Sequence, residues 1–372
     1  MATHQRFSVL HVLAESIASG LTRYVLDLSQ AMVQAGHEVA VASAGGAWQH
    51  LFQERSIPWV NAPLNGGPRA LFKSIHVLHA YLRDRPSNGP VIVHSHHRKS
   101  AIVARRVVAR TGGPMLYTLH LPNIPMTFPW GWLTDWGDLT HAPSEEARDW
   151  LISVGRPCDK IRLLHHGIHV ERFPIATADD RLAARKRLGL SPDQPVAAWV
   201  GRLDTPKNQD WMLDLARASA VALPDLHILM AGDGPGEPLM RREIQEQSLG
   251  SRITMLGLCD PLPVYQACDA VLVSSAIEGF SFVTAEAMSV GRPVLRTRGG
   301  GCQALIIEGV TGRSAPIDKS AFLAAAVTLL GDRATLPEMG RHAADHIRQH
   351  FTFDRQFQNT LTLYDELLAA RF

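Results

Sequence analysis

The fold is decided by the stretch Ser274-Ser275-Ala276-Ile277-Glu278-Gly279-Phe280-Ser281-Phe282-Val283-Thr284-Ala285-Glu286-Ala287-Met288, which follows the apolar segment 270–273. The apolar segment predicts a buried strand, and the Ser/Glu/Gly loop after it leads into a helical stretch. A strand that turns into a helix is typical of an α/β domain, and open sheets of such domains bind ligands at the carboxyl ends of their strands. We therefore expect a binding site at this junction.

The residue types at this junction suit a phosphate group and a sugar together. Gly279 allows the backbone to approach a ligand closely. The amides from Phe280 to Val283 lie at the helix start, where unpaired N–H groups and the helix dipole favour phosphate. Glu278 and Glu286 add two carboxylates that can accept hydrogen bonds from hydroxyl groups. An isolated pair of glutamates would more often be a loop residue and a helix cap, so further motifs must support this interpretation.

The stretch resembles the E-x7-E motif of the retaining glycosyltransferases of family 4, which have the GT-B fold. This resemblance implies that Glu278 faces the donor sugar as a catalytic residue and that Glu286 holds the ribose hydroxyls. It implies an α/β protein of two Rossmann-like, doubly wound domains that face a cleft, with a C-terminal helix that crosses back to the first domain.

A second motif supports the first. The strand expected at 196–200 leads into Gly201-Arg202-Leu203-Asp204-Thr205-Pro206-Lys207-Asn208, which resembles the family's Val-Gly-Arg-Leu…Lys-Gly motif, with Asn208 in place of glycine. A guanidinium and an ammonium group at the end of a strand suit a leaving group that gains negative charge, such as a nucleoside diphosphate. Arg202 can bind phosphate oxygens bidentately, whereas Lys207 acts as a point charge.

Further stretches extend the resemblance over nearly the whole chain. Gly232-Asp233-Gly234 matches the family's Gly-x-Gly turn, and Ala304 stands where the family usually has a glutamate. The resemblance implies a set of residues around the donor diphosphate, namely Gly20, Arg202, Lys207, Gly279, Phe280 and Ser281. It implies a second set around the ribose and base, namely Glu286, Leu256, Gly257 and Val283.

The first half of the chain alternates between apolar segments and amphipathic stretches. Strands are predicted at 7–13, 38–42, 57–60, 91–93, 115–119 and 161–164, with helices between them that include 68–83 and 98–110. Such alternation predicts a parallel, doubly wound sheet. Ser19-Gly20 lies in the first loop, where the family usually has two glycines, and Gly20 could equally be a turn residue.

Histidines crowd the ends of these strands. His94, His96 and His97 end one strand and His120 ends the next, which raises the possibility of a zinc site. Neighbouring side chains on a strand point to opposite faces, and no carboxylate follows at ligand spacing, so we expect no metal. By resemblance to the family's Thr-x-His stretch, His120 contacts the transferred sugar as a catalytic residue. The alternative is a histidine that only ends a strand.

The segment 128–136 contains three tryptophans, Trp130, Trp132 and Trp136. They could stack on acceptor sugars or anchor the protein at a membrane interface. The interpretation that we favour slightly is a helix packed on the sheet, because Trp132 and Trp136 are four residues apart. Basic segments at 69–85 and 96–110 would suit an anionic membrane or acceptor.

Size and composition agree with two soluble domains. The chain has 372 residues, of which 46% are hydrophobic and 19% charged, and its net charge of +2 does not indicate nucleic-acid binding. The four cysteines show no C-x-x-C spacing. No signal peptide or membrane span is expected, so we expect a cytoplasmic protein, with peripheral association at the inner face of the membrane as an alternative. The domains expected are 1–172 on the acceptor side, 173–352 around the nucleotide sugar, and a helix at 353–372 that packs on the first domain.

Together these features predict a retaining, metal-independent glycosyltransferase that requires no cofactor. It would move a hexosyl unit from a UDP-sugar, or alternatively from GDP-mannose, to a cell-envelope glycan or a lipid-linked acceptor such as those of lipopolysaccharide, capsule or exopolysaccharide synthesis. The alternatives are a GT-B epimerase, a phosphorylase or a non-catalytic protein that binds a sugar nucleotide. A nicotinamide dehydrogenase is disfavoured because no strand precedes a G-x-G-x-x-G motif.

Overall fold

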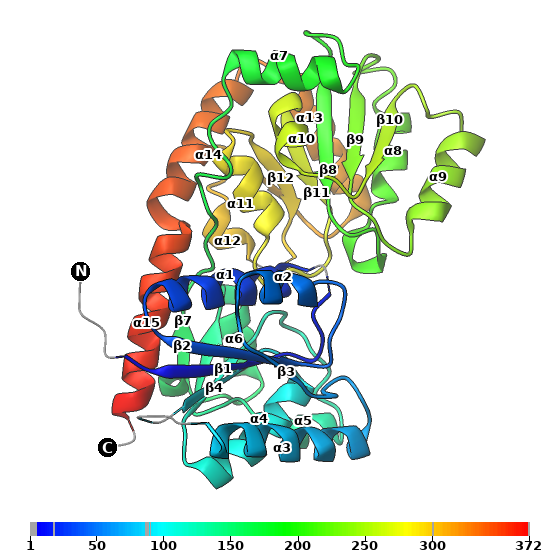
Figure 1. The fold of residues 1–372 in the computed structure, drawn as a ribbon. Helices are drawn as coiled ribbons and strands as arrows, with labels where there is room; N and C mark the ends of the chain where they lie inside the picture. Colours follow the sequence, from blue (N-terminus) through cyan, green and yellow to red (C-terminus); the bar gives the residue numbers. More distant parts are fainter. Residues whose placement is uncertain (1–5, 18, 86–88, 90, 300, 371–372) are drawn as a thin grey trace. The chain divides into compact units, whose positions relative to one another are not determined.

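The computed structural model describes residues 6–17, 19–85, 89, 91–299 and 301–370 (Figure 1). The chain divides into two compact units. Unit 1 comprises Met1–His166 together with Arg355–Phe372, and unit 2 comprises Gly167–Asp354. Each unit is built on one sheet, and all strand pairs in both sheets are parallel.

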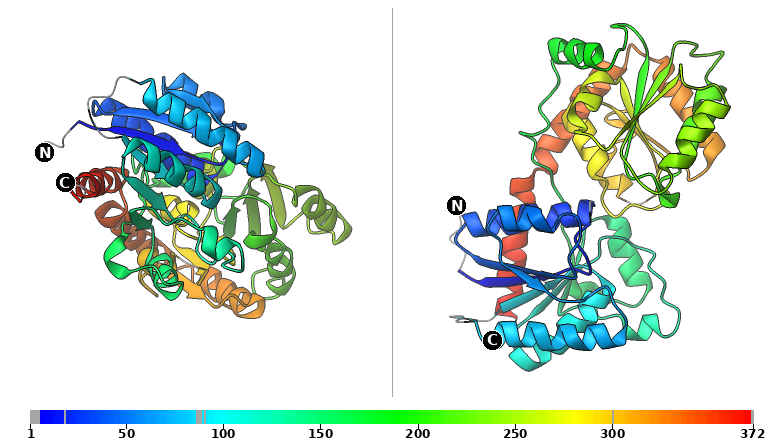
Figure 2. Two further views of the ribbon diagram at one scale, coloured as in Figure 1. Left: turned by 90° about the horizontal axis from the view of Figure 1, so that it is seen from below. Right: turned by 45° about the vertical axis from the view of Figure 1, so that its right-hand side comes forward.

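Unit 1 contains a seven-stranded sheet in the order β3-β2-β1-β4-β5-β6-β7. Helices lie on both faces of this sheet (Figure 2), as expected when each strand is connected to a parallel neighbour by a helix. The elements are β1 (Ser8–Val12), α1 (Gly20–Gln34), β2 (Glu38–Ser43), α2 (Gln49–Glu54), β3 (Trp59–Asn61), α3 (Pro68–Arg83), β4 (Val91–Ser95), α4 (Arg98–Thr111), β5 (Met115–Thr118), α5 (Trp130–Leu133), β6 (Leu139–Ala142), α6 (Glu145–Ser153), a 3-10 turn (Cys158–Lys160) and β7 (Ile161–Leu163).

Unit 2 contains a six-stranded sheet in the order β10-β9-β8-β11-β12-β13. Its elements are α7 (Ala178–Arg187), β8 (Val196–Val200), a 3-10 turn (Thr205–Lys207), α8 (Trp211–Ala218), β9 (His227–Ala231), α9 (Glu237–Glu246), β10 (Ile253–Gly257), α10 (Leu262–Ala267), β11 (Ala270–Val273), α11 (Phe282–Ser289), β12 (Val294–Thr297), α12 (Cys302–Leu305), β13 (Gly312–Ala315), α13 (Lys319–Gly331) and α14 (Leu336–His350). Buried side chains form a separate core on each face of this sheet.

The last helix, α15 (Phe353–Ala369), returns to unit 1. Tyr364 on this helix is fully buried, and its hydroxyl group lies 2.7 Å from Nδ1 of His94 on β4. Arg162 on β7 also forms an ion pair with Glu366. The predictions of two Rossmann-like sheets and of a final helix that packs on the first domain are confirmed.

The strands predicted for unit 1 agree with the structure to within a few residues, with one omission. Strand β6, which lies between β5 and β7, was not predicted. It has the sequence Leu-Thr-His-Ala, in which polar residues interrupt the apolar run, yet all four residues are buried. The two polar side chains are satisfied within the sheet, since Thr140 donates to the carbonyl group of Trp136 and His141 lies 2.7 Å from the carbonyl oxygen of Leu164. These contacts depend on tertiary structure.

Candidate functional site

The order of strands in unit 2 reverses at the pair β8 and β11. From β8 the chain continues to β9 on one side, whereas β11 lies on the other side and continues to β12. Such a reversal leaves a crevice outside the carboxyl ends of the two strands, where open α/β sheets bind ligands. The loop 201–210 follows β8 and the loop 274–281 follows β11. Both loops that the sequence marked as functional therefore lie at this point.

The two loops are held together by hydrogen bonds that centre on Ser274. Its hydroxyl group donates to the carbonyl oxygen of Lys207 at 2.6 Å and accepts from the indole N–H of Trp199 at 3.1 Å. The side-chain amide of Asn208 donates to the carbonyl oxygen of Ser274 at 2.8 Å. Asn208 adopts φ +48°, a left-handed conformation that asparagine tolerates, so it can replace the family's glycine. Ser274 and Asn208 are positioning residues that the sequence analysis did not identify.

These contacts bring Lys207 to Glu278. The Lys207 ammonium nitrogen lies 2.7 Å from Oε1 of Glu278, and the two side chains are 27% and 11% exposed. A close pair in a partly buried site is much less screened than a surface pair. One ammonium and one carboxylate group are thus fixed side by side at the strand ends, and both remain partly open to a ligand.

Arg202 lies at the same end of the sheet but points elsewhere. Its Nε pairs with Asp204 at 3.1 Å, and its side chain is half exposed. The backbone of its loop rests on the Gly-x-Gly turn, because a Cβ atom on Gly232 would lie 1.9 Å from the carbonyl oxygen of Gly201. A Cβ atom on Gly234 would lie 2.6 Å from the carbonyl oxygen of Leu203. Both glycines therefore support the loop that carries Arg202.

The start of α11 follows directly from the second loop. Ser281 is its N-cap, and the Ser281 hydroxyl oxygen accepts hydrogen bonds from the amide of Thr284 at 3.4 Å and from its hydroxyl group at 2.9 Å. The ring of Phe280 is buried and packs on Phe351. The backbone of Gly279 and Phe280 packs closely against Gly301, because a Cβ atom on Gly301 would lie 3.0 Å from the Gly279 carbonyl oxygen. From Gly279 to Ser281 the loop therefore contributes mainly backbone at the helix start, whereas Glu278 contributes its side chain.

Glu286 is oriented by a residue that the sequence analysis did not identify. The buried hydroxyl group of Tyr265 on α10 donates to Oε2 of Glu286 at 2.9 Å. Burial, followed by the nearby Glu286 carboxylate, raises the pKa of Tyr265 well above its usual value, so this tyrosine remains a donor. Leu256 and Val283 are partly buried and pack against the same core cluster as Tyr265. Gly257 ends β10, and its carbonyl oxygen accepts from the amide of Gly232 at 2.8 Å.

Gly20 and His120 belong to unit 1. Gly20 is the first residue of α1, directly after the N-cap Ser19, whose hydroxyl oxygen accepts from the amide of Thr22 at 3.2 Å. His120 follows β5, and its Nε2 lies 3.0 Å from Nδ1 of His96. Within unit 1 both residues follow the carboxyl ends of strands, as the sequence predicted.

Two hydrogen-bonded chains of buried side chains run through unit 1 beneath His120. In the first, Nε2 of His141 lies 2.7 Å from the carbonyl oxygen of Leu164, so this nitrogen must donate. The other ring nitrogen of His141 must then accept from the hydroxyl group of Thr118, at 3.1 Å. The Thr118 hydroxyl oxygen in turn accepts from Nε2 of His94 at 2.7 Å, and Nδ1 of His94 accepts from the hydroxyl group of Tyr364 at 2.7 Å. Every histidine of this chain is neutral and fully bonded.

The second chain joins His11, His96 and His120, with 3.0 Å between successive ring nitrogens. Burial lowers the pKa of His11 to about 3 and holds the pKa of His96 and His120 well below 6.5. His11, His94 and His96 each place a ring nitrogen within 4.8 Å of the others, a geometry that could hold a metal ion. Both ring nitrogens of His94 are already hydrogen-bonded, to Tyr364 and to Thr118. The three histidines therefore fit a hydrogen-bonded network better than a metal centre.

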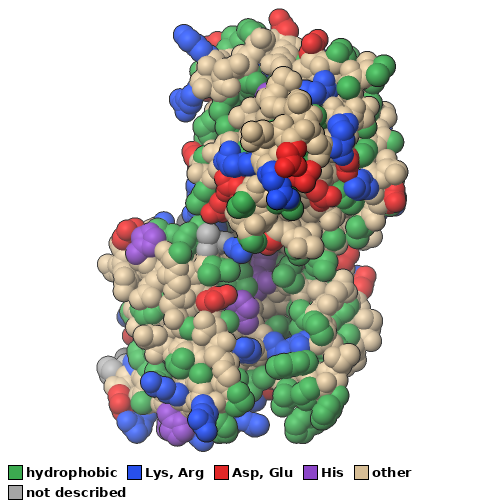
Figure 3. All heavy atoms as spheres, turned by 90° about the vertical axis from the view of Figure 1, so that its right-hand side faces the viewer, with side chains coloured by type: hydrophobic (Ala, Val, Ile, Leu, Met, Phe, Trp, Pro, Cys, Tyr) green, Lys and Arg blue, Asp and Glu red, His purple; other side chains and the backbone are tan. Residues whose placement is uncertain are grey.

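The expectation that Trp132 and Trp136 both pack on the sheet from one helix is wrong for Trp132. Trp136 packs on Tyr117 and Trp150, as predicted for a residue against the sheet. Trp132 does not, because α5 ends at Leu133 and the Trp132 side chain is 83% exposed. Phe128 is 89% exposed, and Trp130 lies 6.0 Å from the guanidinium carbon of Arg98. Figure 3 shows exposed hydrophobic side chains on unit 1.

Comparisons with known proteins agree with both units. A model described as Glycosyltransferase Family 4 matches residues 18–172, and one described as Glycosyl transferases group 1 matches residues 194–332. A D-inositol 3-phosphate glycosyltransferase of Nocardia farcinica is 35% identical over 217 residues, which are 55% of this chain and 47% of that protein. One from Mycolicibacterium vanbaalenii is 30% identical over 292 residues, 68% of this chain and 62% of that protein. These matches thus span about half to three-fifths of the relatives' own length.

Solved structures share the fold over nearly the whole chain. Anabaena HepE in complex with UDP-glucose superposes with a TM-score of 0.83 at 20% identity, covering 97% of this chain and 100% of that one. A sucrose-phosphate synthase from Thermosynechococcus elongatus gives a TM-score of 0.81 at 22% identity, covering 98% and 100%. Among the described residues, no helix combines the length and apolar character that a membrane crossing needs.

Proposed function

We propose, on the premise that the chain belongs to the family 4 glycosyltransferases of GT-B fold, that it transfers a hexosyl unit from a nucleotide-diphosphate sugar with retention of configuration. The observation that carries this proposal is the pair of Lys207 and Glu278, fixed at 2.7 Å where the strand order of unit 2 reverses. A UDP-sugar is the favoured donor. The relatives named as glycosyltransferases and the UDP-glucose complex of a protein with the same fold support this choice.

Charge neutralisation in this site would come from the protein. Lys207 supplies an ammonium group, Arg202 can turn from Asp204 toward phosphate, and the backbone of Gly279, Phe280 and Ser281 supplies amides at a helix start. These groups would stabilise the negative charge that grows on the diphosphate as the glycosidic bond breaks. The donor then needs no metal ion, and the reaction needs no cofactor.

Glu286 would hold the ribose hydroxyls, with Leu256, Gly257 and Val283 around the base. Tyr265 orients the Glu286 carboxylate through a hydrogen bond to its Oε2 atom. Glu278 and His120 would contact the transferred sugar. In the mechanism that we propose, the leaving phosphate accepts the proton of the acceptor hydroxyl on the same face of the sugar. Isolation of a covalent glycosyl adduct on Glu278 would contradict this mechanism.

The acceptor that we propose is a cell-envelope glycan or a lipid-linked sugar at an anionic membrane surface. Phe128 and Trp132 expose large aromatic rings, and Arg98 lies beside Trp130 in the same part of unit 1. Exposed aromatic and basic side chains together favour peripheral contact with lipid headgroups. Sedimentation with anionic and neutral vesicles tests this point. The double substitution Phe128→Ser and Trp132→Ser should reduce binding to anionic vesicles without changing nucleotide affinity, and equal binding by the variant would contradict it.

The donor site is tested by calorimetric titration with UDP, GDP and ADP in the absence of metal. We expect saturable binding of UDP that is weakened in Lys207→Ala. The matched control is Lys73→Ala, an exposed lysine on α3 of unit 1, which should bind as the wild type does. Binding of none of the three nucleotides, or equal binding by Lys207→Ala, would overturn the site assignment.

Product analysis separates transfer from the other reactions of this fold. A transferase releases UDP from a UDP-hexose only when an acceptor is supplied, apart from slow hydrolysis. An epimerase would convert the donor without an acceptor, a phosphorylase would require phosphate, and a non-catalytic protein would bind nucleotide without release of product.

A further inference from the structure

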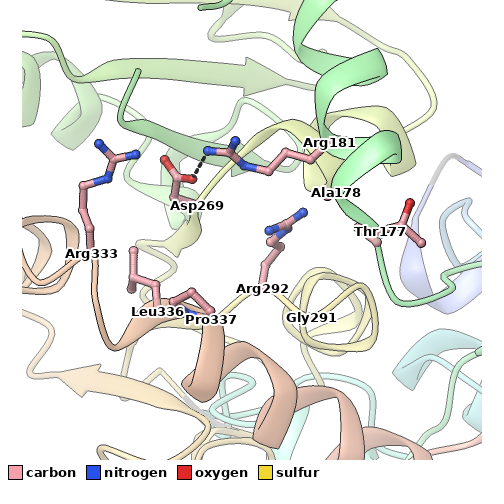
Figure 4. Close-up of a pocket in the computed structure, with 10 residues that line it drawn as sticks. Thr177, Ala178, Arg181, Asp269, Gly291, Arg292, Arg333, Leu336 and Pro337 are labelled. Atoms are coloured by element: carbon pink, nitrogen blue, oxygen red, sulfur yellow. Dashed lines mark hydrogen bonds and ion pairs between the residues drawn. The ribbon is translucent and has the colours of Figure 1, made fainter. Parts of the chain in front are cut away.

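Unit 2 contains a pocket that none of the motifs above explains. It has a volume of about 320 Å³ and is lined by Ala176, Thr177, Ala178, Arg181, Asp269, Gly291, Arg292, Arg333, Leu336 and Pro337. This volume lies within the range typical of small-molecule sites. Figure 4 shows the side chains of Arg181, Arg292 and Arg333 directed into it from three different segments. We call it the arginine pocket.

Positive charge dominates the arginine pocket. Asp269 is the one carboxylate among its lining residues, and it is already shared by two guanidinium groups. It accepts from Arg181 at 2.8 Å, from the buried Arg185 at 3.1 Å and from the backbone amide of Val196 at 2.8 Å. Arg292 and Arg333 form no ion pair with Asp269 within the described ranges, although the charge of Asp269 acts on Arg292 from a greater distance.

The two remaining arginines can still donate to a ligand. Arg292 donates through Nε and Nη2 to the carbonyl oxygens of Tyr265 and Gln266, at 2.8 and 2.9 Å, which fixes its guanidinium plane. Its Nη1 has no hydrogen-bond partner in the described part of the chain. Arg333 is exposed and makes no hydrogen bond or ion pair within the described ranges. Burial lowers the pKa of Arg292, Cys268 and Asp269 oppose this shift, and the nearby Arg181 adds a smaller lowering. An anion in the pocket would relieve this unfavourable placement.

The start of helix α14 adds to the positive electrostatic potential of the arginine pocket. α14 begins at Leu336, which lines the pocket, and its N-cap Thr335 makes no side-chain cap. The acidic residue of its first turn, Glu338, is 75% exposed and lies 3.9 Å from Arg341. The positive end of a 15-residue helix and three guanidinium groups therefore meet at one hollow.

We propose that the arginine pocket binds a small phosphorylated molecule, at a site separate from the nucleotide-sugar site. Guanidinium groups from three segments match the several oxygens of a phosphate group, and the volume leaves room for a small organic group attached to it. Gly291 and Arg292 come one residue after the end of α11, the helix that carries Glu286. The amide of Arg292 donates to the carbonyl oxygen of Ala287 on that helix. Binding in the pocket is thus placed to influence the donor site.

The test is calorimetric titration with inorganic phosphate and with glucose 6-phosphate, at constant ionic strength and with UDP in saturating amounts. We expect saturable binding, about tenfold weaker for each of Arg333→Ala and Arg181→Ala, because each removes charge-assisted hydrogen bonds. Arg333 has no contact to lose, so its variant should fold normally. The matched control is Arg187→Ala, an exposed arginine on α7 outside the pocket, which should bind as the wild type does.

Each outcome decides the proposal. Tighter binding of glucose 6-phosphate than of phosphate identifies an ester as the ligand, whereas equal binding identifies the free anion. Absence of saturable binding by both probes, or equal affinity in the double variant of Arg181 and Arg333, would overturn the proposal. Repeating the titration with Lys207→Ala keeps the two sites distinct, because the arginine pocket should bind equally well when the nucleotide site is impaired.

Discussion

The ammonium nitrogen of Lys207 lies 2.7 Å from a carboxylate oxygen of Glu278, and the two residues are 71 positions apart in the chain. The pair joins the loops after β8 and β11, the two strands at which the sheet of unit 2 reverses its order. In the site that we propose, a ligand phosphate would compete with Glu278 for this ammonium group. Binding of the donor would therefore free the carboxylate to act on the sugar.

Lys207→Ala should weaken UDP binding by about 2 kcal/mol, roughly thirtyfold, because it removes a charge-assisted contact and leaves a carboxylate beside the phosphate. Calorimetric titration measures this loss. Lys207→Arg should recover part of the affinity, since it restores the charge with a different shape. An alanine variant with wild-type affinity would rule out contact between Lys207 and the diphosphate.

Glu278→Gln should lower kcat by more than tenfold while it changes the Kd for UDP by less than threefold. The substitution keeps the shape of the side chain but removes the negative charge next to the proposed sugar site. Steady-state kinetics with a UDP-hexose and a supplied acceptor measure kcat. A variant that loses UDP affinity but retains kcat would instead assign Glu278 to nucleotide binding alone.

Tyr265→Phe should weaken UDP binding by a smaller factor than Glu286→Ala does, because the carboxylate remains but loses the hydrogen bond that orients it. A buried hydrogen bond of this kind contributes about 1 kcal/mol, so we expect a loss of about fivefold. Glu246→Ala, an exposed carboxylate on α9, is the control and should have no effect. Equal affinity of Tyr265→Phe and the wild type would show that Glu286 does not need this partner.

Gly232→Ala should destabilise unit 2 by at least about 2 kcal/mol, because its Cβ atom would lie 1.9 Å from the carbonyl oxygen of Gly201 and the residue adopts φ +132°. The UDP affinity should fall as well, since the displaced loop carries Arg202. Gly250→Ala is a matched control, because a Cβ atom there meets nothing within 4 Å. Urea denaturation measures the stability of the two variants, and calorimetric titration measures their UDP affinity. Equal denaturation midpoints for the two variants would contradict the expected clash.

The free energy of unfolding should fall as the pH falls from about 6.5 toward 4. Burial lowers the pKa of His11 to about 3 and that of His141 to about 4. Between these values and the unfolded pKa near 6.5, the unfolded chain binds protons that the folded chain does not. Each such histidine therefore contributes a slope of about 1.4 kcal/mol per pH unit, with stability lost toward acid.

Urea denaturation of wild type and His11→Leu at pH 7.5 and 5.5 tests this slope. His11→Leu should lose less stability than the wild type on acidification, because the substitution removes one group that takes up a proton on unfolding. His50→Leu, at an exposed histidine, should keep the wild-type slope. Identical slopes for all three proteins would show that His11 is not held neutral in the folded state.

The sequence alone determined the two parallel sheets and the places of the site loops. Short apolar segments alternate with amphipathic stretches, and this local pattern leaves few arrangements other than a doubly wound sheet. The motifs around Arg202, Lys207 and Glu278 follow such segments directly, so they must lie at carboxyl ends of strands. Strand β6 lacked this apolar signal, and its burial could not be predicted.

Only the tertiary structure decided which side chains meet. Tyr265 donates to Glu286 and Tyr364 reaches His94, across 21 and 270 positions, and neither contact has a periodic signal in the sequence. The exposure of Trp132 could not be predicted either. Its spacing from Trp136 is typical of one helix face, but helix α5 ends at Leu133, before Trp136. The arginine pocket likewise depends on three segments that are joined only by the packing of α7, α11 and α14. Such contacts arise from the three-dimensional placement of whole elements, whereas sequence patterns report only neighbours within one element.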